Sequence, residues 1–114
     1  MTGAIQVVTT TDSKEDAQRI SRVIVELRLA ACVQVLGPIV STYWWQGKME
    51  TAEEWLCVIK TREERYAALE AAITEIHTYD IPEILATPIV SGNEAYLAWL
   101  REETRDEGPA TRAP

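Results

Sequence analysis

Three side chains that could bind a metal ion stand close together in the last third of the sequence. His77 is the only histidine, and the carboxylates of Asp80 and Glu83 follow it in a segment that reads as a loop. Imidazole and carboxylate groups together suit copper, zinc and other first-row divalent ions. These residues therefore predict a loose site for Cu²⁺ or another divalent cation, and no organic cofactor is expected.

The residues of this predicted site also have structural explanations. His77 comes at the expected end of a helix, where it could cap the last carbonyl groups. Glu83 could accept backbone hydrogen bonds or pair with Lys60, which we otherwise expect to line the same cleft. Tyr79 carries a hydroxyl on an aromatic body, so it could line the cleft or simply pack there. The residues alone leave both kinds of role open.

Tyr43, Trp44 and Trp45 form a second group of interest. Consecutive side chains of a strand point to alternate faces, so both faces of this segment must contact something other than water. Aromatic residues are enriched in the cores of protein interfaces. We therefore expect these three residues to make subunit contacts rather than to form a ligand-stacking platform, whereas Trp55 and Trp99 are expected in the core.

Composition and charge restrict the classes of partner. The 114 residues carry a net charge of −7 without a cluster of Lys and Arg, so nucleic acid is not an expected partner. Glu50, Glu53 and Glu54 are expected to form a solvated strand face rather than a metal site. No run of about 18 apolar residues predicts a membrane span. The N-terminus lacks a signal-peptide pattern, and Cys32 and Cys57 are too few for a disulfide scaffold, so a cytoplasmic protein with buried thiols is expected.

An enzymatic function is not expected. Acylphosphatase-type enzymes share the element order derived below, but they need a phosphate-binding loop with an arginine after the first strand. The loop over 9–13 lacks glycine and arginine and carries an acidic residue. No nucleophile can be assigned as a partner of His77, and the cysteines do not form the CxxC motif of heavy-metal-associated metallochaperones. A binding or regulatory protein is the expected class.

Apolar periodicity and turn signals predict four strands and three helices. The predicted elements are a strand over 4–9, a helix between 13 and 31, a strand over 31–45, a strand over 53–60, a helix between 61 and 76, a strand over 83–90, and a helix after 93. Ser13 and Thr61 each begin a capping-box pattern. This α+β order is ferredoxin-like, βαββαβ with an extra C-terminal helix. We predict a single domain over residues 1–101 and a flexible C-terminal tail over 102–114.

Two details of this order bear on assembly. Pro38 cannot donate to a sheet, so Gly37 and Pro38 predict a bulge or a bend in one long strand. This strand pairs through a turn over 46–48 to form a long β-hairpin. Right-handed crossovers place both long helices on one face of the sheet. The other face would then expose apolar side chains to water, and this favours an oligomer.

Five segments resemble the signatures of CutA proteins in order and spacing. They cover 29–33, 41–48, 60–61, 79–83 and 92–99, so that the resemblance extends over nearly everything from Ile5 to Leu100. It implies a ferredoxin-like subunit that forms a tight, PII-like homotrimer through its long hairpins. It also implies a role in tolerance of divalent cations, copper especially, since several members bind copper or other divalent ions. With one histidine and two carboxylates per subunit, we expect the metal to bind weakly at an inter-subunit cleft.

The chain departs from the family pattern near the predicted metal site. The family motif reads His-Pro-Tyr-x-x-Pro-Glu, and Thr78 replaces its first proline. Some members carry a cysteine just after the first strand and a second histidine beside the motif, where this chain has Thr9 and Ile76. The soft thiolate that would favour Cu(I) is therefore missing.

An alternative interpretation involves no metal. A PII-like trimer could sense a small anion or nucleotide in the clefts between subunits, where Lys60, Arg62 and Arg65 would supply positive charge. A scaffold protein without a metal role is a further form of the same alternative.

Overall fold

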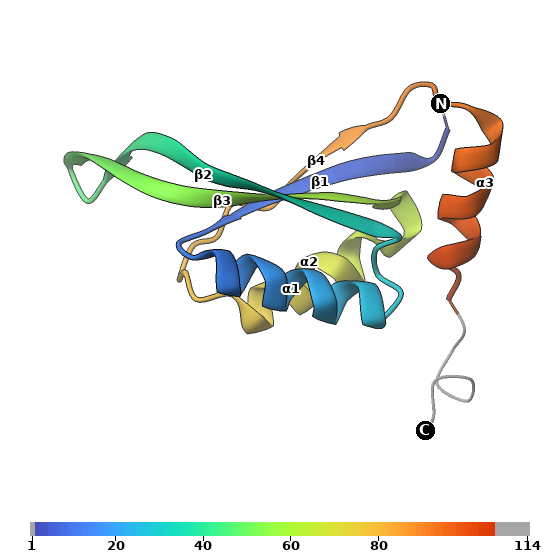
Figure 1. The fold of residues 1–114 in the computed structure, drawn as a ribbon, viewed down its shortest axis with the longest axis horizontal. Helices are drawn as coiled ribbons and strands as arrows, with labels where there is room; N and C mark the ends of the chain where they lie inside the picture. Colours follow the sequence, from blue (N-terminus) through green and yellow to red (C-terminus); the bar gives the residue numbers. More distant parts are fainter. Residues whose placement is uncertain (1, 107–114) are drawn as a thin grey trace.

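The computed structural model describes residues 2–106, which form a four-stranded sheet, two helices on one of its faces and a third helix at one end (Figure 1). In chain order the elements are β1 (Ala4–Thr11), α1 (Lys14–Glu26), β2 (Cys32–Trp45), β3 (Lys48–Arg62), the 3₁₀ turn η1 (Glu63–Arg65), α2 (Tyr66–Ile76), β4 (Leu85–Pro88) and α3 (Glu94–Glu103). The predicted α+β class and the ferredoxin-like order with an added C-terminal helix are confirmed.

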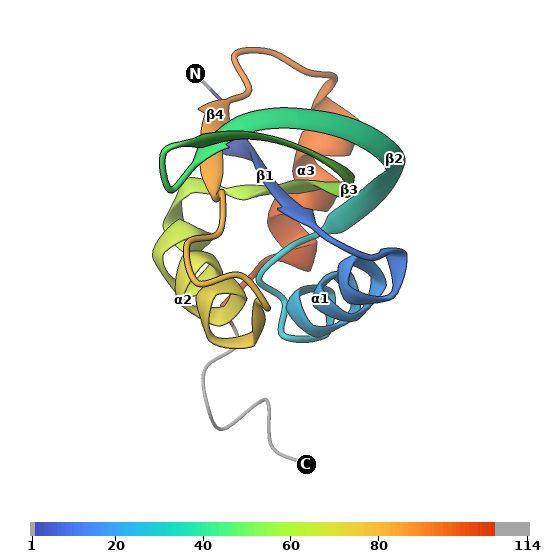
Figure 2. The same cartoon turned by 90° about the vertical axis from the view of Figure 1, so that its left-hand side faces the viewer.

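The sheet has the strand order β2-β3-β1-β4, and every neighbouring pair is antiparallel. Figure 2 shows α1 and α2 side by side on one face. The core between the two layers is apolar, and Val7, Ile20 and Ile59 are among its fully buried members. β4 lies at an edge, as Pro88 predicts. It is shorter than the predicted strand over 83–90.

β2 and β3 form a hairpin whose tip extends beyond the helices, at the left of Figure 1. The register of the ladder shifts between Leu36 and Ile39, so the bulge lies at Gly37 and Pro38 as predicted. The turn at the tip contains Gln46 and Gly47, both at positive φ. The long hairpin is thus confirmed, and it carries its aromatic side chains away from the core of the domain.

α1 begins at the predicted cap and ends earlier than predicted. The Ser13 hydroxyl accepts a 3.1 Å hydrogen bond from the amide of Asp16, which satisfies one free N–H of the first turn. The helix ends at Glu26 because Arg28 adopts a left-handed φ of 63° and turns the chain back toward β2. The Arg28 guanidinium then pairs with Glu103 at the end of α3, with Nη1 2.6 Å from Oε1.

The start of α2 differs from the predicted capping box. β3 continues through Arg62, which pairs with Ala4 of β1, so Thr61 is still a strand residue. η1 separates this strand from the helix, and Arg65 at the helix start makes no side-chain cap. The Thr61 hydroxyl is buried without a hydrogen-bond partner among the described residues. Extension of the ladder therefore overrides the local capping signal.

α3 packs at the end of the sheet opposite the hairpin tip (Figure 1). Leu97 and Leu100 are buried against Ala4. Trp99 lies off this helical face and is 42% exposed beside the ring of Tyr96, so its predicted place in the core is wrong. Leu97 and Leu100, three positions apart, form the helical face that packs against β1.

Packed structure continues past residue 101. α3 runs to Glu103, and Thr104 after it is fully buried. Its hydroxyl donates to the Leu100 carbonyl at 2.8 Å, while its own carbonyl accepts a 3.1 Å hydrogen bond from Arg62. The remainder of the predicted tail, 107–114, lies outside the described residues.

Apolar side chains are exposed on the sheet face opposite α1 and α2 and along the hairpin. Leu36 and Leu85 lie on that sheet face and are about half exposed. Val40, Trp44 and Met49 share one face of the hairpin and are 72%, 75% and 68% exposed. Within residues 2–106, no helix has the length and apolar character needed to cross a membrane. The oligomer was predicted from the sheet face opposite the helices, where Leu36 and Leu85 lie. Val40, Trp44 and Met49 are instead on the face of the hairpin that continues the helix-covered side of the sheet.

Candidate functional site

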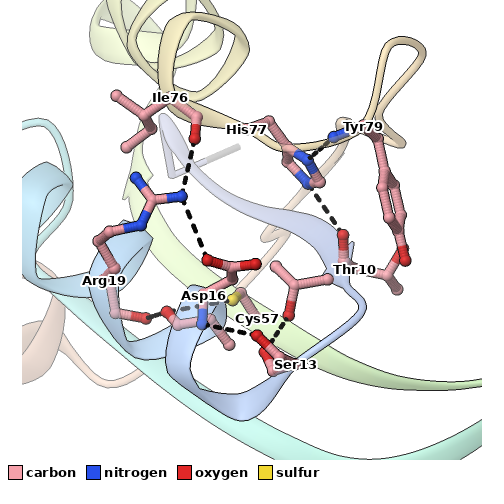
Figure 3. A network of polar contacts seen from close by, with 11 residues as sticks. Thr10, Ser13, Asp16, Arg19, Cys57, Ile76, His77 and Tyr79 are labelled. Atoms are coloured by element: carbon pink, nitrogen blue, oxygen red, sulfur yellow. Dashed lines mark hydrogen bonds and ion pairs between the residues drawn. The ribbon is translucent and has the colours of Figure 1, made fainter.

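His77 joins the loop after α2 to the end of β1 (Figure 3). Its Nε2 lies 2.9 Å from the carbonyl oxygen of Thr10, and its Nδ1 accepts a 3.0 Å hydrogen bond from the amide of Tyr79. A carbonyl can only accept and an amide N–H can only donate, so Nε2 carries the proton and Nδ1 carries none. Both ring nitrogens are used within the chain.

This arrangement gives His77 a positioning role. A metal ion could bind the imidazole only by breaking one of its two hydrogen bonds. The last turn of α2 is capped by another residue, Arg19 of α1, which donates to the Ile76 carbonyl oxygen at 2.9 Å. The imidazole instead fixes the start of the loop, so that Tyr79 can reach the hairpin.

A pocket of about 690 Å³ opens between the base of the hairpin and this loop. Three carboxylates and three aromatic rings line it: Glu54, Asp80, Glu83, Tyr43, Trp45 and Tyr79. The other lining residues are Ser41, Ile81 and three threonines, and no lysine or arginine of the described chain is among them. The pocket therefore combines negative charge with aromatic surface.

Glu54 is the buried carboxylate of this pocket. It is 7% exposed, and its Oε2 accepts a 2.7 Å hydrogen bond from the Tyr79 hydroxyl. The pKa of Tyr79 lies well above its ordinary value. Burial is the largest cause, and the hydrogen bond to Glu54, the charge of Glu54 and the charge of Asp12 add to it. Tyr79 therefore stays protonated and keeps donating to Glu54 at neutral pH.

Sequence reasoning missed Glu54 as a site residue. We expected it on a solvated face together with Glu50 and Glu53, and those two are indeed exposed. The register places Glu54 and Glu53 on opposite faces of β3. A useful signal was present, because Glu54 shares its face with the predicted aromatic residues Tyr43 and Trp45.

The pocket brings together residues that were predicted for two separate sites. Tyr79, Asp80 and Glu83 were expected at a metal-binding cleft, and Tyr43 and Trp45 were expected at a subunit interface. Asp80 and Glu83 are exposed, whereas Tyr79 is half-buried. The predicted cleft and the predicted interface are therefore adjacent parts of one surface.

Two predicted residues lie elsewhere. Lys60 does not line the pocket and makes no ion pair with Glu83 in the described chain, because its ammonium group donates to Gln34 on the neighbouring strand. Trp44 points to the opposite face of the hairpin from Trp45 and is the most exposed of the three aromatic residues.

The residues of a single chain do not form a closed metal centre. Within residues 2–106, no group of three His, Cys, Asp or Glu side chains lies close enough to hold a metal ion. The thiols add no ligand, because Cys57 is fully buried and points its Sγ at the Ala17 carbonyl, 3.8 Å away. Burial raises the pKa of the Cys57 thiol, which keeps it protonated. Cys32 is a free, half-buried thiol outside the pocket.

Two of the basic residues named in the anion-sensor alternative contact the segment that follows α3. Arg62 donates to the Thr104 carbonyl, and Arg65 lies with its Nη1 3.6 Å from the carboxylate of Asp106. Arg65 is itself buried. With Lys60 paired to Gln34, these cations do not line the pocket described above.

Most of the chain matches one known family. The family model described as CutA1 divalent ion tolerance protein covers residues 5–103. A chloroplastic protein from Oryza sativa subsp. japonica, Protein CutA 1, is 44% identical over 103 residues, 90% of this chain and 58% of that protein. The divalent-cation tolerance protein CutA of Thermus thermophilus is 42% identical over 98 residues, 86% of this chain and 95% of that protein.

Solved structures share the fold closely. The crystal structure of CutA1 from Oryza sativa superposes with a TM-score of 0.88 and 42% identity, covering 94% of this chain and 100% of that one. The periplasmic divalent cation tolerance protein CutA from Archaeoglobus fulgidus gives a TM-score of 0.87 and 37% identity, covering 90% of this chain and 99% of that one. The described chain thus spans nearly all of these solved subunits but little more than half of the chloroplastic relative.

Proposed function

We propose that this chain, which belongs to the CutA1 divalent ion tolerance family, acts in divalent-cation tolerance by binding cations rather than by catalysis. The observation that carries the proposal is the pocket beside Glu54 at the base of the hairpin, which is lined by three carboxylates and, among the described residues, by no basic side chain. Such a pocket attracts cations by its local potential. The only histidine uses both ring nitrogens in hydrogen bonds, which leaves no general base of the usual kind for catalysis.

Cu²⁺ or another divalent cation is the proposed ligand, held weakly. Asp80 and Glu83 are exposed at the mouth of the pocket, and Glu54 lies at its wall. Carboxylate oxygens alone discriminate poorly among divalent ions and favour the harder ones. We therefore expect low selectivity and an affinity below that of a closed metal centre.

We further propose that the functional unit is a homotrimer in which the pocket faces an inter-subunit cleft. The support is the exposed surface on the sheet face opposite α1 and α2, where Leu36 lies together with the pocket residues Tyr43 and Trp45. Patches of this kind on small proteins mark association surfaces. A second copy could supply the ligands that a single chain lacks.

The proposed location is the cytoplasm. Cys32 and Cys57 are both free thiols, and such thiols are typical of reducing compartments. The relatives above include a chloroplastic and a periplasmic protein by name, so location varies among similar proteins. Cell fractionation with an antibody against the native protein would test the cytoplasmic location. Detection of the protein in the periplasmic fraction would contradict it.

Calorimetric titration of the assembled full-length protein with Cu²⁺ and with Zn²⁺ tests the metal function. We expect the double variant Asp80→Asn, Glu83→Gln to bind at least about tenfold more weakly, because each charged contact contributes about 1.5–3 kcal/mol. Glu53→Gln removes an exposed carboxylate from the opposite face of β3 and should leave the affinity unchanged.

Two results would contradict this assignment. Absence of binding by the unmodified protein would remove the direct cation role. Equal losses in the double variant and in Glu53→Gln would show that the metal senses only the net charge of −7. His77→Ala is the third variant to titrate. If it alone lost metal affinity, the metal ligand would be the His77 imidazole and not the two carboxylates.

A further inference from the structure

Glu54 is a buried carboxylate without a cationic partner among the described residues. It is 7% exposed, and its only hydrogen-bond donor among the described residues is the Tyr79 hydroxyl, 2.7 Å from Oε2. No described residue donates to Oε1, and none of the ion pairs within residues 2–106 involves this carboxylate. Oε1 is not among the fully enclosed polar atoms of the described chain, so it remains open at the pocket wall, where a cation could pair with it.

The negative charge extends around Glu54. Asp80 and Glu83 line the same pocket, and Asp12 lies close enough to Tyr79 to act on its hydroxyl. Among the described residues no lysine or arginine lines the pocket. An anionic ligand would therefore be repelled, and the ligand should carry positive charge.

The opposite wall of the pocket is aromatic. Tyr43 and Trp45 stand on the same face of the hairpin as Glu54, and in a single chain both residues are at least 40% exposed. The face of an indole or phenol ring attracts an ammonium group within about 6 Å, and it also covers apolar carbon atoms. A bare metal ion would make little use of such a wall.

The size and the ligand set of the pocket also suit an organic cation. The pocket holds about 690 Å³, which is in the range of small-molecule sites. Within the described chain no three metal-ligating side chains converge. One carboxylate and an aromatic wall, in contrast, are sufficient to bind an ammonium group.

We propose that this pocket binds a small alkylammonium cation, with Glu54 pairing with the ammonium group and Trp45 covering the alkyl carbons. The inference extends the proposed function to a second class of cation at the same pocket, and it does not require that a metal bind there. A free amine and a lysine side chain of another protein share this chemistry. The experiment below distinguishes these two sources.

The test uses n-butylammonium as the probe and n-butanol as its neutral control. Each is titrated into the assembled full-length protein in the presence of EDTA, and binding is followed by saturation-transfer NMR. We expect n-butylammonium to bind at least about tenfold more tightly than n-butanol, because only the charged probe can pair with a carboxylate. Equal binding of the two probes, or no binding of n-butylammonium, would overturn the proposal.

The chain offers a matched pair of variants. Glu54→Gln removes the buried charge and keeps an acceptor for Tyr79, whereas Glu53→Gln makes the same change on the exposed, opposite face of β3. We expect Glu54→Gln to weaken n-butylammonium binding about tenfold and Glu53→Gln to leave it unchanged. Equal effects of the two variants would overturn the proposal.

A second variant and a second probe complete the design. Trp45→Leu changes an exposed hairpin residue, so it keeps the test decisive if Glu54→Gln fails to fold, and it should weaken n-butylammonium more than n-butanol. Lack of any effect of Trp45→Leu on n-butylammonium would contradict the proposed aromatic wall. A short peptide with one lysine, with its lysine-acetylated form as control, identifies the source of the ligand. If the peptide binds more tightly than the free amine, the natural ligand is a lysine side chain of another protein.

The metal and amine proposals fail separately. Loss of Cu²⁺ binding in the Asp80→Asn, Glu83→Gln variant with n-butylammonium binding intact supports both. If Glu54→Gln keeps its affinity for Cu²⁺ but no longer binds n-butylammonium, this supports the assignment of Glu54 to the ammonium group. Metal binding without any n-butylammonium binding overturns the inference and leaves the proposed function standing.

Discussion

At the scale of single residues, the site depends on contacts between positions far apart in the chain. His77 meets a carbonyl 67 positions away, and Tyr79 meets Glu54 across 25 positions. Each contact joins the loop after α2 to a different strand, β1 in the first case and β3 in the second. The two hydrogen bonds together hold Tyr79 over the pocket, which is why the imidazole matters although it does not line the pocket itself.

Replacement of His77 is expected to affect stability. His77→Ala removes the hydrogen bonds to Thr10 and Tyr79, and we expect a loss of about 1–2 kcal/mol in the free energy of unfolding. Thr78→Ala changes the exposed neighbouring residue and should remain within about 0.5 kcal/mol of the parent. Urea denaturation at matched protein concentration measures both. A His77→Ala protein as stable as the Thr78→Ala control would exclude this positioning role.

Tyr79 gives stability a dependence on alkaline pH. Its pKa is raised in the folded protein by burial and by Glu54, whereas the unfolded chain titrates near the ordinary value of about 10. Its contribution is therefore fully present below pH 10 and is lost as the pH rises toward the folded pKa. We expect the stability difference between the parent and Tyr79→Phe to shrink above pH 10. A stability difference between the parent and Tyr79→Phe that stays constant from neutral pH to well above pH 10 would contradict this role of Tyr79.

At the scale of elements, the bulge in β2 depends on close packing between the strands of the hairpin. A Cβ atom built on Gly37 would lie 2.4 Å from Cδ1 of the Trp55 ring, and Trp55 packs against the core. Glycine is therefore required here for space, since its φ is not in the left-handed region. Pro38 explains why the ladder is interrupted, and Trp55 explains why the preceding residue has no side chain.

Gly37→Ala is expected to destabilise the protein by about 1–3 kcal/mol, because the Trp55 ring must shift from its place against the core. A double-mutant cycle with Trp55→Ala tests the cause, since the alanine should cost clearly less once the ring is absent. Thermal unfolding of the four proteins gives the coupling. Simple additivity of the two changes would show that the clash is not the source of the loss.

The end of α1 presents two opposing effects of similar size. The left-handed φ of 63° at Arg28 costs a residue with a side chain about 1 kcal/mol. Its ion pair with Glu103, between side chains 46% and 38% exposed, returns about 0.2–1 kcal/mol. We expect Arg28→Gly to lie within about 1 kcal/mol of the parent and Arg28→Ala to be the less stable of the two, as urea denaturation can measure. The reverse order would contradict the assignment of strain at this position.

At the scale of the whole molecule, the sequence predicts what local patterns determine. The bulge at Pro38, the cap at Ser13 and the edge position of β4 each follow from the chemistry of one or two neighbouring residues. Burial of Glu54 could not be predicted in this way, because a glutamate among other acidic residues becomes buried only when a distant loop brings Tyr79 over it. The capping pattern at Thr61 failed for the same reason, since pairing with β1 extends the strand through it.

The hairpin surface provides the prediction that concerns the whole molecule. Val40, Trp44 and Met49 share one face of the hairpin and are each more than 65% exposed, so a free monomer would leave these large apolar side chains in water. We expect light scattering to give three times the chain mass of 12.8 kDa. Trp44→Glu should shift the protein toward smaller species, because a charge buried among these side chains in an assembly would lack a partner. Ala71→Glu, on the exposed surface of α2, is the matched control and should leave the mass unchanged. If the parent itself has the mass of a single chain, the trimer proposal fails, and the pocket beside Glu54 must then bind its cation with the residues of one chain alone.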